Sequence, residues 1–115
     1  MKPDPLHSVD LPRQSIVEDQ LLCALNLYSR PVDPPVIYDL LAQLLKLTTQ
    51  QRHALLPITK ENAWHNRVRQ ARRRLVDLGY IDRSITRQWT LTEAGQAKAR
   101  EREWQKNLSP DDLGL

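Results

Sequence analysis

The residues of this chain that could do the most specific chemistry lie in segment 62–78, and the chemistry is the reading of DNA bases. In the major groove, arginine pairs bidentately with guanine, and Asn or Gln pairs bidentately with adenine. At about 100° per residue, the apolar residues of a helix over this segment share one side and the polar residues share the other. The predicted base-reading residues on the polar side are Asn62, Asn66, Arg69, Gln70 and Arg73.

Further basic residues are predicted to contact phosphates, which fixes a protein on a duplex without reading its sequence. They are Lys60, His65, Arg67, Arg72 and Arg74 in or beside the helix, and Arg83 and Arg87 around a following turn that would suit the minor groove. The alternative is that these side chains only form a solvated helix face and a solvated loop. Three amides and two arginines facing outward together, directly before a basic turn, favour DNA contact.

The distribution of charge singles out the same region. The chain has 115 residues and a net charge of +3. Residues 59–88 carry 8 Lys or Arg against 3 Asp or Glu, a net +5, whereas residues 1–58 and residues 89–115 each come to −1. Such a local excess of positive charge is typical of a nucleic-acid-binding surface.

The elements that must position these side chains are mostly helices. Apolar residues recur at helical spacing over residues 15–25 and again over residues 36–45, which predicts two helices. Asp33 is the predicted N-cap of the second helix, with Pro34 tolerated at the first helical position.

Two further signals delimit the central helices. Thr48 and Gln51 have the spacing of a capping box, which opens a short helical segment running to Leu55. In the long helix that follows, steps of four and three predict a buried stripe formed by Trp64, Val68, Ala71, Leu75 and Leu78. Gly79 stands where a left-handed residue commonly ends a helix.

The remaining pattern predicts two short strands, residues 80–83 and 88–91, and a last helix over residues 93–107 capped by Thr92. The predicted fold is therefore mainly α with a small β-hairpin, a winged helix-turn-helix.

The predicted domain organisation has three parts. Residues 1–13 form a flexible N-terminal arm, residues 14–107 the winged-helix domain, and residues 108–115 a C-terminal tail.

The sequence offers no sign of catalysis or of a cofactor. His7, His53 and His65 have no Cys or carboxylate at metal-ligand spacing, and the chain has only 3 Gly and no Gly-rich phosphate loop. We therefore expect no metal, no cofactor and no enzyme activity. The lone Cys23 lies in an apolar run, and no leader or apolar stretch of about 18 residues is present, which favours a cytoplasmic protein without a membrane span.

Several short motifs occur in a family-specific order. They are Leu55-Leu-Pro before the long helix, Asn66-Arg67-Val68 with Ala71, Arg72 and Leu75 inside it, Leu78-Gly-Tyr-Ile after it, and Trp89-x-Leu-Thr-Glu-Ala-Gly95. On these motifs, residues from about 20 to 97 resemble the N-terminal domain of Mrr-type restriction endonucleases. The resemblance implies a winged helix thought to recognise DNA, joined in that family to a separate magnesium-dependent nuclease domain. It also implies DNA recognition by Asn66, Arg67 and Arg72.

The chain departs from that family in three ways. Gln70 stands where the family usually has an aromatic residue, and Thr86-Arg87 stands where the wing tip usually has Arg-Gly. Without that glycine, we expect a wing that is longer or differently aimed. The nuclease domain has no counterpart in the sequence, which leaves either a piece of a longer enzyme or a stand-alone DNA-binding protein.

We expect a double-stranded DNA-binding winged-helix protein that acts as a transcriptional regulator or as the DNA-recognition module of a restriction-type system with a partner nuclease. The alternative is a protein–protein interaction or dimerisation module without DNA binding. Trp104, on a polar final helix, would then lie in the seam of a homodimer or of a hetero-complex rather than in the core.

Overall fold

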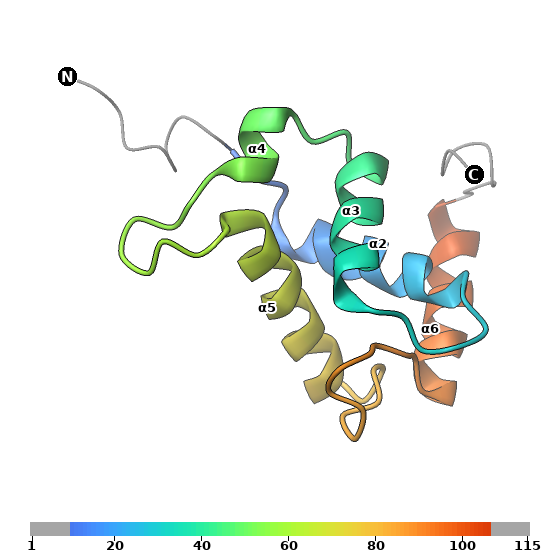
Figure 1. Ribbon diagram of the computed structural model, residues 1–115. Coiled ribbons are helices and arrows are strands. Elements are labelled where there is room, and N and C mark those ends of the chain that lie inside the picture. The colour runs from blue at the N-terminus through green and yellow to red at the C-terminus, as the bar shows by residue number, and fades with distance from the viewer. Residues whose placement is uncertain (1–9, 107–115) are drawn as a thin grey trace.

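The computed structural model describes residues 10–106, and their side chains as far as residue 102. Helices make up most of the regular structure of this part (Figure 1): α2 (Gln14–Asn26), α3 (Pro34–Leu44), α4 (Thr49–His53), α5 (Ala63–Asp77) and α6 (Glu93–Lys106). The prediction of a mainly α-helical fold is confirmed. The N-terminal arm and the C-terminal tail fall mainly outside the described residues, so their boundaries stay predictions.

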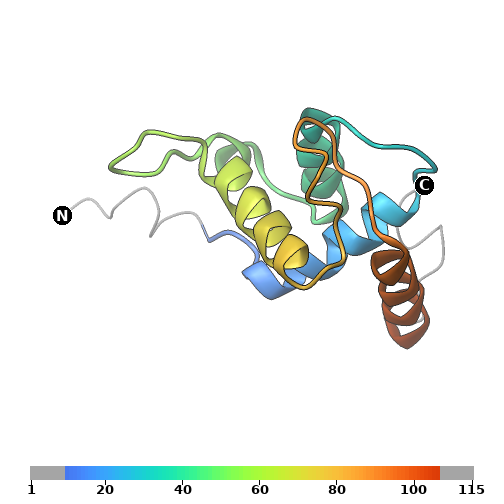
Figure 2. The same ribbon diagram turned by 90° about the horizontal axis from the view of Figure 1, so that it is seen from below.

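Helix α2 is the centre of the core. It contacts α3, α5 and α6, which approach it from different sides (Figure 2). Residues 21–25, Leu-Leu-Cys-Ala-Leu, are all buried, although they cover a full turn and more of the helix. A helix that is apolar on most sides requires such a covering, because one packed face would leave the other apolar side chains in water.

The predicted start of α3 is confirmed, but its capping differs from the usual form. Asp33 occupies the N-cap and Pro34 the first helical position. The Asp33 side chain makes no capping hydrogen bond, and instead accepts one from Gln88 Nε2 at 3.0 Å. The carboxylate therefore joins α3 to a loop far along the chain.

The capping box at α4 is confirmed. Thr48 Oγ1 accepts a hydrogen bond from the Gln51 amide at 3.1 Å, and Gln51 Oε1 accepts one from the Thr48 amide at 2.8 Å. The helix ends at His53, two residues before the predicted end.

Helix α5 ends as its glycine predicts. Gly79 has φ +82°, its amide bonds to Val76 O at 3.0 Å, and the Tyr80 amide bonds to Leu75 O at 2.9 Å. This pair of bonds is the Schellman motif. The buried stripe is confirmed for four residues, Trp64, Val68, Ala71 and Leu75, together with Ala63.

The assignment of Leu78 to the buried stripe is wrong, since its side chain is 44 % exposed. The helix ends at Asp77 and the chain turns at Gly79, so the position facing the core at this end is taken by Ile81, which is 2 % exposed.

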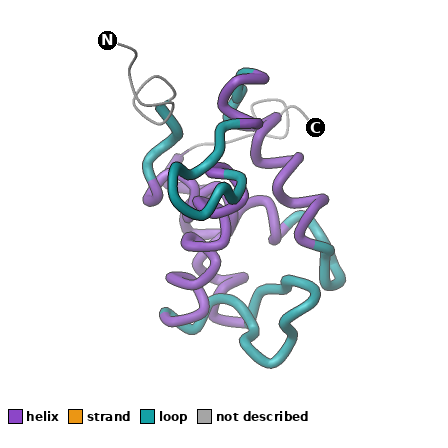
Figure 3. The backbone as a smooth tube through the Cα atoms, turned by 60° about the vertical axis from the view of Figure 1, so that its left-hand side comes forward, coloured by secondary structure: helices purple, strands orange, loops and turns teal. Residues whose placement is uncertain are grey.

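The two predicted strands are reduced to isolated pairs, and Figure 3 shows no strand among the residues it describes. Ile81 pairs antiparallel with Leu91, and Trp89 pairs antiparallel with Val32. Pairing stops after one step because Asp82 Oδ1 accepts hydrogen bonds from the Ser84 amide at 2.9 Å and its hydroxyl at 2.6 Å, which turns the chain. Segment 89–91 thus lies between Val32 and Ile81, a three-stretch arrangement that the hairpin prediction lacked.

The start of α6 is locked onto the end of α5. Thr92 Oγ1 accepts a hydrogen bond from the Gly95 amide at 3.0 Å, which confirms the predicted cap, and donates one to Gly79 O at 2.6 Å. A Cβ on Gly95 would lie 2.0 Å from Tyr80 O, so only glycine fits there. The Leu-Thr-x-x-Gly pattern therefore has a packing cause.

Helix α6 bears on two further predictions. Trp104, the predicted seam residue, lies in α6, but its side chain is outside the described ones. Within residues 10–106, no helix has the length and apolar character to cross a membrane.

Candidate nucleic-acid interface

The face of α5 turned away from the core presents most of the predicted base-reading residues. Arg69, Gln70 and Arg73 are exposed, and Asn66 is half-buried. Arg74, predicted to flank this face, is exposed beside Arg73. These five side chains occupy about three turns of one helix, so a flat or grooved partner could meet them together. We call Asn66, Arg69, Gln70, Arg73 and Arg74 the outer face of α5.

Little within the described residues occupies the outer face. Arg69 Nη2 lies 3.6 Å from Glu61 Oε1, and both side chains are well exposed. An exposed ion pair of this kind contributes little stability, so Arg69 could exchange the carboxylate for a phosphate or a base at small cost. Gln70, Arg73 and Arg74 make no hydrogen bond or ion pair with the rest of residues 10–102.

Asn62 has a different place from the other predicted base readers. Its Oδ1 accepts a hydrogen bond from the His65 amide at 3.0 Å, which caps α5, and its Nδ2 donates to Arg52 O at 2.8 Å. Because both ends of the amide are engaged, base reading by Asn62 would uncap the helix. We assign Asn62 to holding the start of α5 on α4.

Arg67 and Arg72 lie on the sides of α5 and bond within the protein. Arg67 Nη1 donates to Pro12 O at 2.8 Å and so holds the chain before α2 against α5. The Arg72 guanidinium lies 5.6 Å from the centroid of the Trp89 ring, and its Nη2 donates a long hydrogen bond, 3.4 Å, to Ile85 O. Each of these two guanidinium groups therefore holds a backbone carbonyl of the protein itself, Arg67 that of Pro12 and Arg72 that of Ile85.

His65 is half-buried at the first turn of α5. Its ring stacks on Tyr38 of α3, with centroids 4.3 Å apart and planes 12° apart. Desolvation and the nearby Arg69 charge lower the pKa of His65 below its usual 6.5. The imidazole is therefore mainly neutral at pH 7, so it could donate a hydrogen bond to DNA but would add little positive charge.

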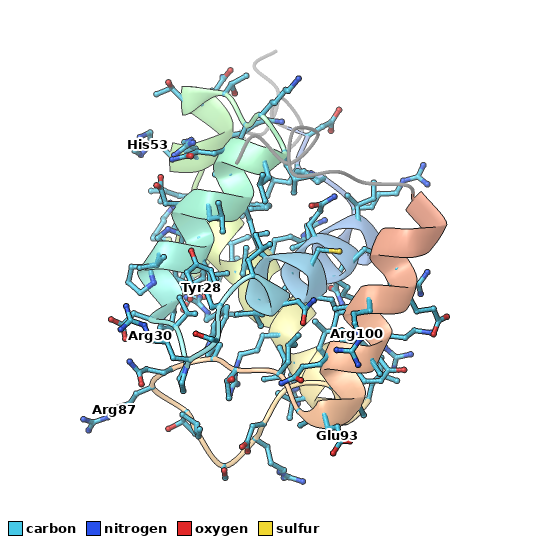
Figure 4. All side chains as sticks on the ribbon, turned by 90° about the vertical axis from the view of Figure 1, so that its right-hand side faces the viewer. Tyr28, Arg30, His53, Arg87, Glu93 and Arg100 are labelled. Atoms are coloured by element: carbon cyan, nitrogen blue, oxygen red, sulfur yellow. The ribbon has the colours of Figure 1, made fainter. Side chains whose placement is uncertain are left out.

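Two loops flank the outer face, one at each end of α5. Lys60 is exposed on the first, residues 54–62, and has a left-handed backbone, φ +62°. Arg83 and Arg87 are exposed on the second, residues 82–88, and Arg87 points away from the body of the protein (Figure 4). The arrangement brings basic groups from both sides to the same helix.

One basic residue near the second loop was missed by the sequence interpretation. Arg30 is exposed, and the pairing of Val32 with Trp89 brings its segment beside Gln88, with which it lines a shallow hollow. Figure 4 shows Arg30 and Arg87 on the same side of the molecule. The signal was weak in the sequence, because Arg30 lies more than 50 residues from the loop that it approaches.

No group of three or more His, Cys, Asp and Glu side chains gathers to hold a metal ion in residues 10–102. A hollow of about 500 Å³ between α3, α4 and α5 contains the charged groups of Asp39 and Arg52, but these pair with each other at 2.9 Å.

Comparison with known families identifies the module. The family described as the Mrr N-terminal domain matches residues 21–101, more than two thirds of the chain. No curated protein and no solved structure matches. The match covers the second half of α2, helices α3 to α5 and most of α6, and so includes the outer face of α5 and both flanking loops. It associates the chain with restriction systems, through the non-catalytic N-terminal part of Mrr. The chain belongs to the Mrr N-terminal domain family.

Proposed function

We propose that this chain is a winged-helix domain that binds double-stranded DNA, with α5 in the major groove. The observation that carries the proposal is the outer face of α5, where three arginines, a Gln and an Asn stand together with almost no internal partner. Duplex DNA fits this surface because its phosphates balance the charge and its base edges accept or donate to these side chains.

The order of elements supports the winged-helix part of the proposal. Helix α2, the Val32 stretch, helices α3 and α4, helix α5 and the paired stretches at residues 81 and 89–91 follow one another as in that fold. A recognition helix with a loop beside it is how helix-turn-helix variants meet the major groove and an adjacent groove. In this assignment the second loop, residues 82–88, is the wing.

The residues divide into three roles. Base edges are read by Asn66, Arg69, Gln70 and Arg73. Phosphates are held by Arg30, Lys60, Arg74, Arg83 and Arg87, with His65 as a neutral donor. The surface is positioned from within by Asn62, Arg67 and Arg72. In the cell, the domain serves a restriction-type system as its DNA-recognition module beside a partner nuclease, or regulates transcription.

Salt dependence tests the proposal directly. Fluorescence anisotropy with a labelled duplex of about 24 base pairs, roughly two helical turns, would measure affinity from about 50 to 200 mM KCl. Neutralisation of about five phosphates gives a log–log slope of about −4 to −5. Absence of binding at low salt, or binding that ignores salt, would contradict the proposal.

A matched pair of variants locates the surface. Combined replacement of Arg69, Arg73 and Arg74 by Ala is expected to lower the affinity and to make the slope shallower by about 1, because Arg74 is the one of the three that holds a phosphate. Arg100→Ala is the control, because Arg100 is exposed on α6, whose main packing partner is α2 (Figure 4). An equal loss of affinity for the duplex in the triple variant and in Arg100→Ala would contradict the assignment of DNA binding to the outer face of α5.

Selection of bound sequences from a random duplex pool distinguishes the residues that read bases from those that bind phosphates. Asn66→Ala or Arg73→Ala should relax the selected sequence, whereas Arg74→Ala or Arg87→Ala should lower affinity for all sequences alike.

A protein-interaction module is the second candidate. It is favoured by the exposed apolar side chains of Tyr28 and Val36, which line the hollow beside Arg30. A purely protein-binding domain would associate in sedimentation experiments and leave duplex DNA free.

A further inference from the structure

The first loop, residues 54–62, projects from the protein at the start of α5, on the side away from α6 (Figure 1). At its tip, Ile58 is 91 % exposed, far more than the other exposed large apolar residues of the described part of the chain, none of which exceeds 48 %. Pro57 precedes it and Lys60 follows two residues later. The exposed Ile58 side chain contributes little to the stability of the free protein, and its apolar surface is available to a partner.

Backbone hydrogen bonds close the base of this loop and fix its conformation. The Leu56 amide donates to Glu61 O at 2.8 Å, and the Ala63 amide donates to Ala54 O at 2.8 Å. The Lys60 amide closes the tip by donating to Leu56 O at 3.0 Å. Because the second of these bonds joins the loop to the first residue of α5, the tip must move with that helix.

Beside Ile58 the loop carries one cation, Lys60, that makes no ion pair within the described residues, whereas the acidic Glu61 lies 3.6 Å from Arg69. Lys60 is exposed on the same loop, and Arg69 of the outer face reaches back to Glu61 on the loop. A protein partner that buries Ile58 would also have to supply an acidic group for Lys60. Nucleic acid supplies the counter-charge in its phosphates and an apolar surface in its base stacks.

We propose that Ile58 is an apolar wedge that enters the minor groove beside the major-groove site and partly unstacks a base step, while Lys60 contacts the phosphate between the two grooves. The inference rests on the proposed function, because it takes α5 as the recognition helix. A loop that continues the start of a groove-bound helix crosses one strand of the duplex, and the next groove on that side is the minor groove. Ile is among the side chains that wedge base steps in this way.

If Ile58 wedges a base step, the affinity for a duplex depends on how easily its base steps unstack. The test is therefore to compare the affinities for a flexible and a stiff duplex. Two duplexes of equal length and base composition would be compared by anisotropy, one rich in TA and CA steps and one without pyrimidine–purine steps. The full chain is expected to bind the flexible duplex about tenfold more tightly. Ile58→Ala should abolish most of this preference and retain the affinity for the stiff duplex and the salt slope.

The control is Leu78→Ala, which removes an exposed apolar side chain at the opposite end of α5 and should keep the preference. Lys60→Ala should make the salt slope shallower by about 1. Thermal unfolding of each variant checks folding, which replacement of so exposed a side chain should leave unchanged.

The outcomes separate this inference from the function on which it rests. If the unaltered chain binds neither duplex, the proposed function fails. If it binds both with a normal salt slope but Ile58→Ala keeps the preference, or weakens both duplexes equally, DNA binding stands and the wedge is overturned.

Discussion

The two loops that flank α5 both carry exposed basic residues but are held by different means. Backbone bonds hold the first loop, residues 54–62, through the Leu56–Glu61 and Ala63–Ala54 pairs. The second, residues 82–88, has one backbone bond at its base, from the Asp82 amide to Thr90 O at 3.0 Å, and otherwise depends on side chains: Arg72 beneath it and Gln88 at its end. Backbone bonds survive most substitutions, whereas side-chain anchors can each be removed by one. The first loop is therefore expected to tolerate mutation, and the second to depend on a few residues.

The contrast extends to the turn of the second loop. Ser84 donates from its hydroxyl and from its amide to Asp82, and these bonds lower the pKa of Asp82 below its usual 3.8. A carboxylate so held stays charged and keeps the chain turned at neutral pH. The hydrogen-bonded Asp82 side chain thus turns the chain in a loop that contains no glycine.

The largest effect should come from Trp89→Ala. Trp89 is 3 % exposed, packs edge-on against Tyr38 and supports Arg72, so its loss leaves a cavity under the second loop. We expect the free energy of unfolding to fall by about 3–5 kcal/mol in denaturant titrations. Ile58→Ala in the first loop should change it by less than about 0.5 kcal/mol. Similar decreases in the free energy of unfolding of Trp89→Ala and Ile58→Ala would contradict the proposed difference between the two loops.

Gly95→Ala should come next, because it displaces the base of the second loop. The new Cβ would meet Tyr80 O, a backbone atom that cannot move alone. We expect a loss toward the upper end of the roughly 1–3 kcal/mol typical of overpacking. Gly79→Ala is the matched control: its Cβ meets nothing within 4 Å, so only its left-handed backbone costs, by about 1 kcal/mol. A larger loss at Gly79 would contradict this account.

Arg72→Met sharpens the comparison without opening a cavity. Methionine keeps much of the buried stem but loses the guanidinium that lies over Trp89 and bonds Ile85 O. We expect a loss of about 1 kcal/mol and faster hydrogen exchange at the amides of residues 82–88, with residues 54–62 unchanged. Arg74→Met, on the outer face, should alter neither loop. Faster exchange in both loops would show that Arg72 acts on α5 as a whole.

The smallest effect concerns pH and the helix start beside the first loop. The folded-state pKa of His65 lies below its unfolded value of 6.5, so folding favours the neutral ring. The resulting stability is present above pH 6.5 and is lost as the pH falls toward the folded-state pKa. In His65→Gln, unfolding free energies measured above and below pH 6.5 should differ less than in the unaltered chain. Identical pH dependence would contradict the assignment.

Local signals allowed much of this fold to be predicted. The capping box at Thr48, the glycine at Gly79 and the cap at Thr92 depend on residues a few positions apart, and the structure confirms all three. The pairing of Val32 with Trp89 joins segments more than 50 residues apart, so no local pattern predicted it.

The site divides in the same way. The outward direction of Arg69, Gln70 and Arg73 follows from helical period alone, whereas the engagement of Arg67 depends on Pro12, 55 residues away, and that of Arg72 on Ile85. Amphipathic spacing can show which side of a helix a residue occupies. It cannot show that a distant carbonyl has already taken the guanidinium.

The hydroxyl of Thr92 has a mechanical consequence. It bridges the carbonyl of Gly79 and the amide of Gly95, and the Gly95 backbone rests directly against Tyr80. The end of α5 and the start of α6 thus meet through short, stiff contacts with no hinge between them. A displacement of the end of α5 is therefore expected to be transmitted directly to the start of α6.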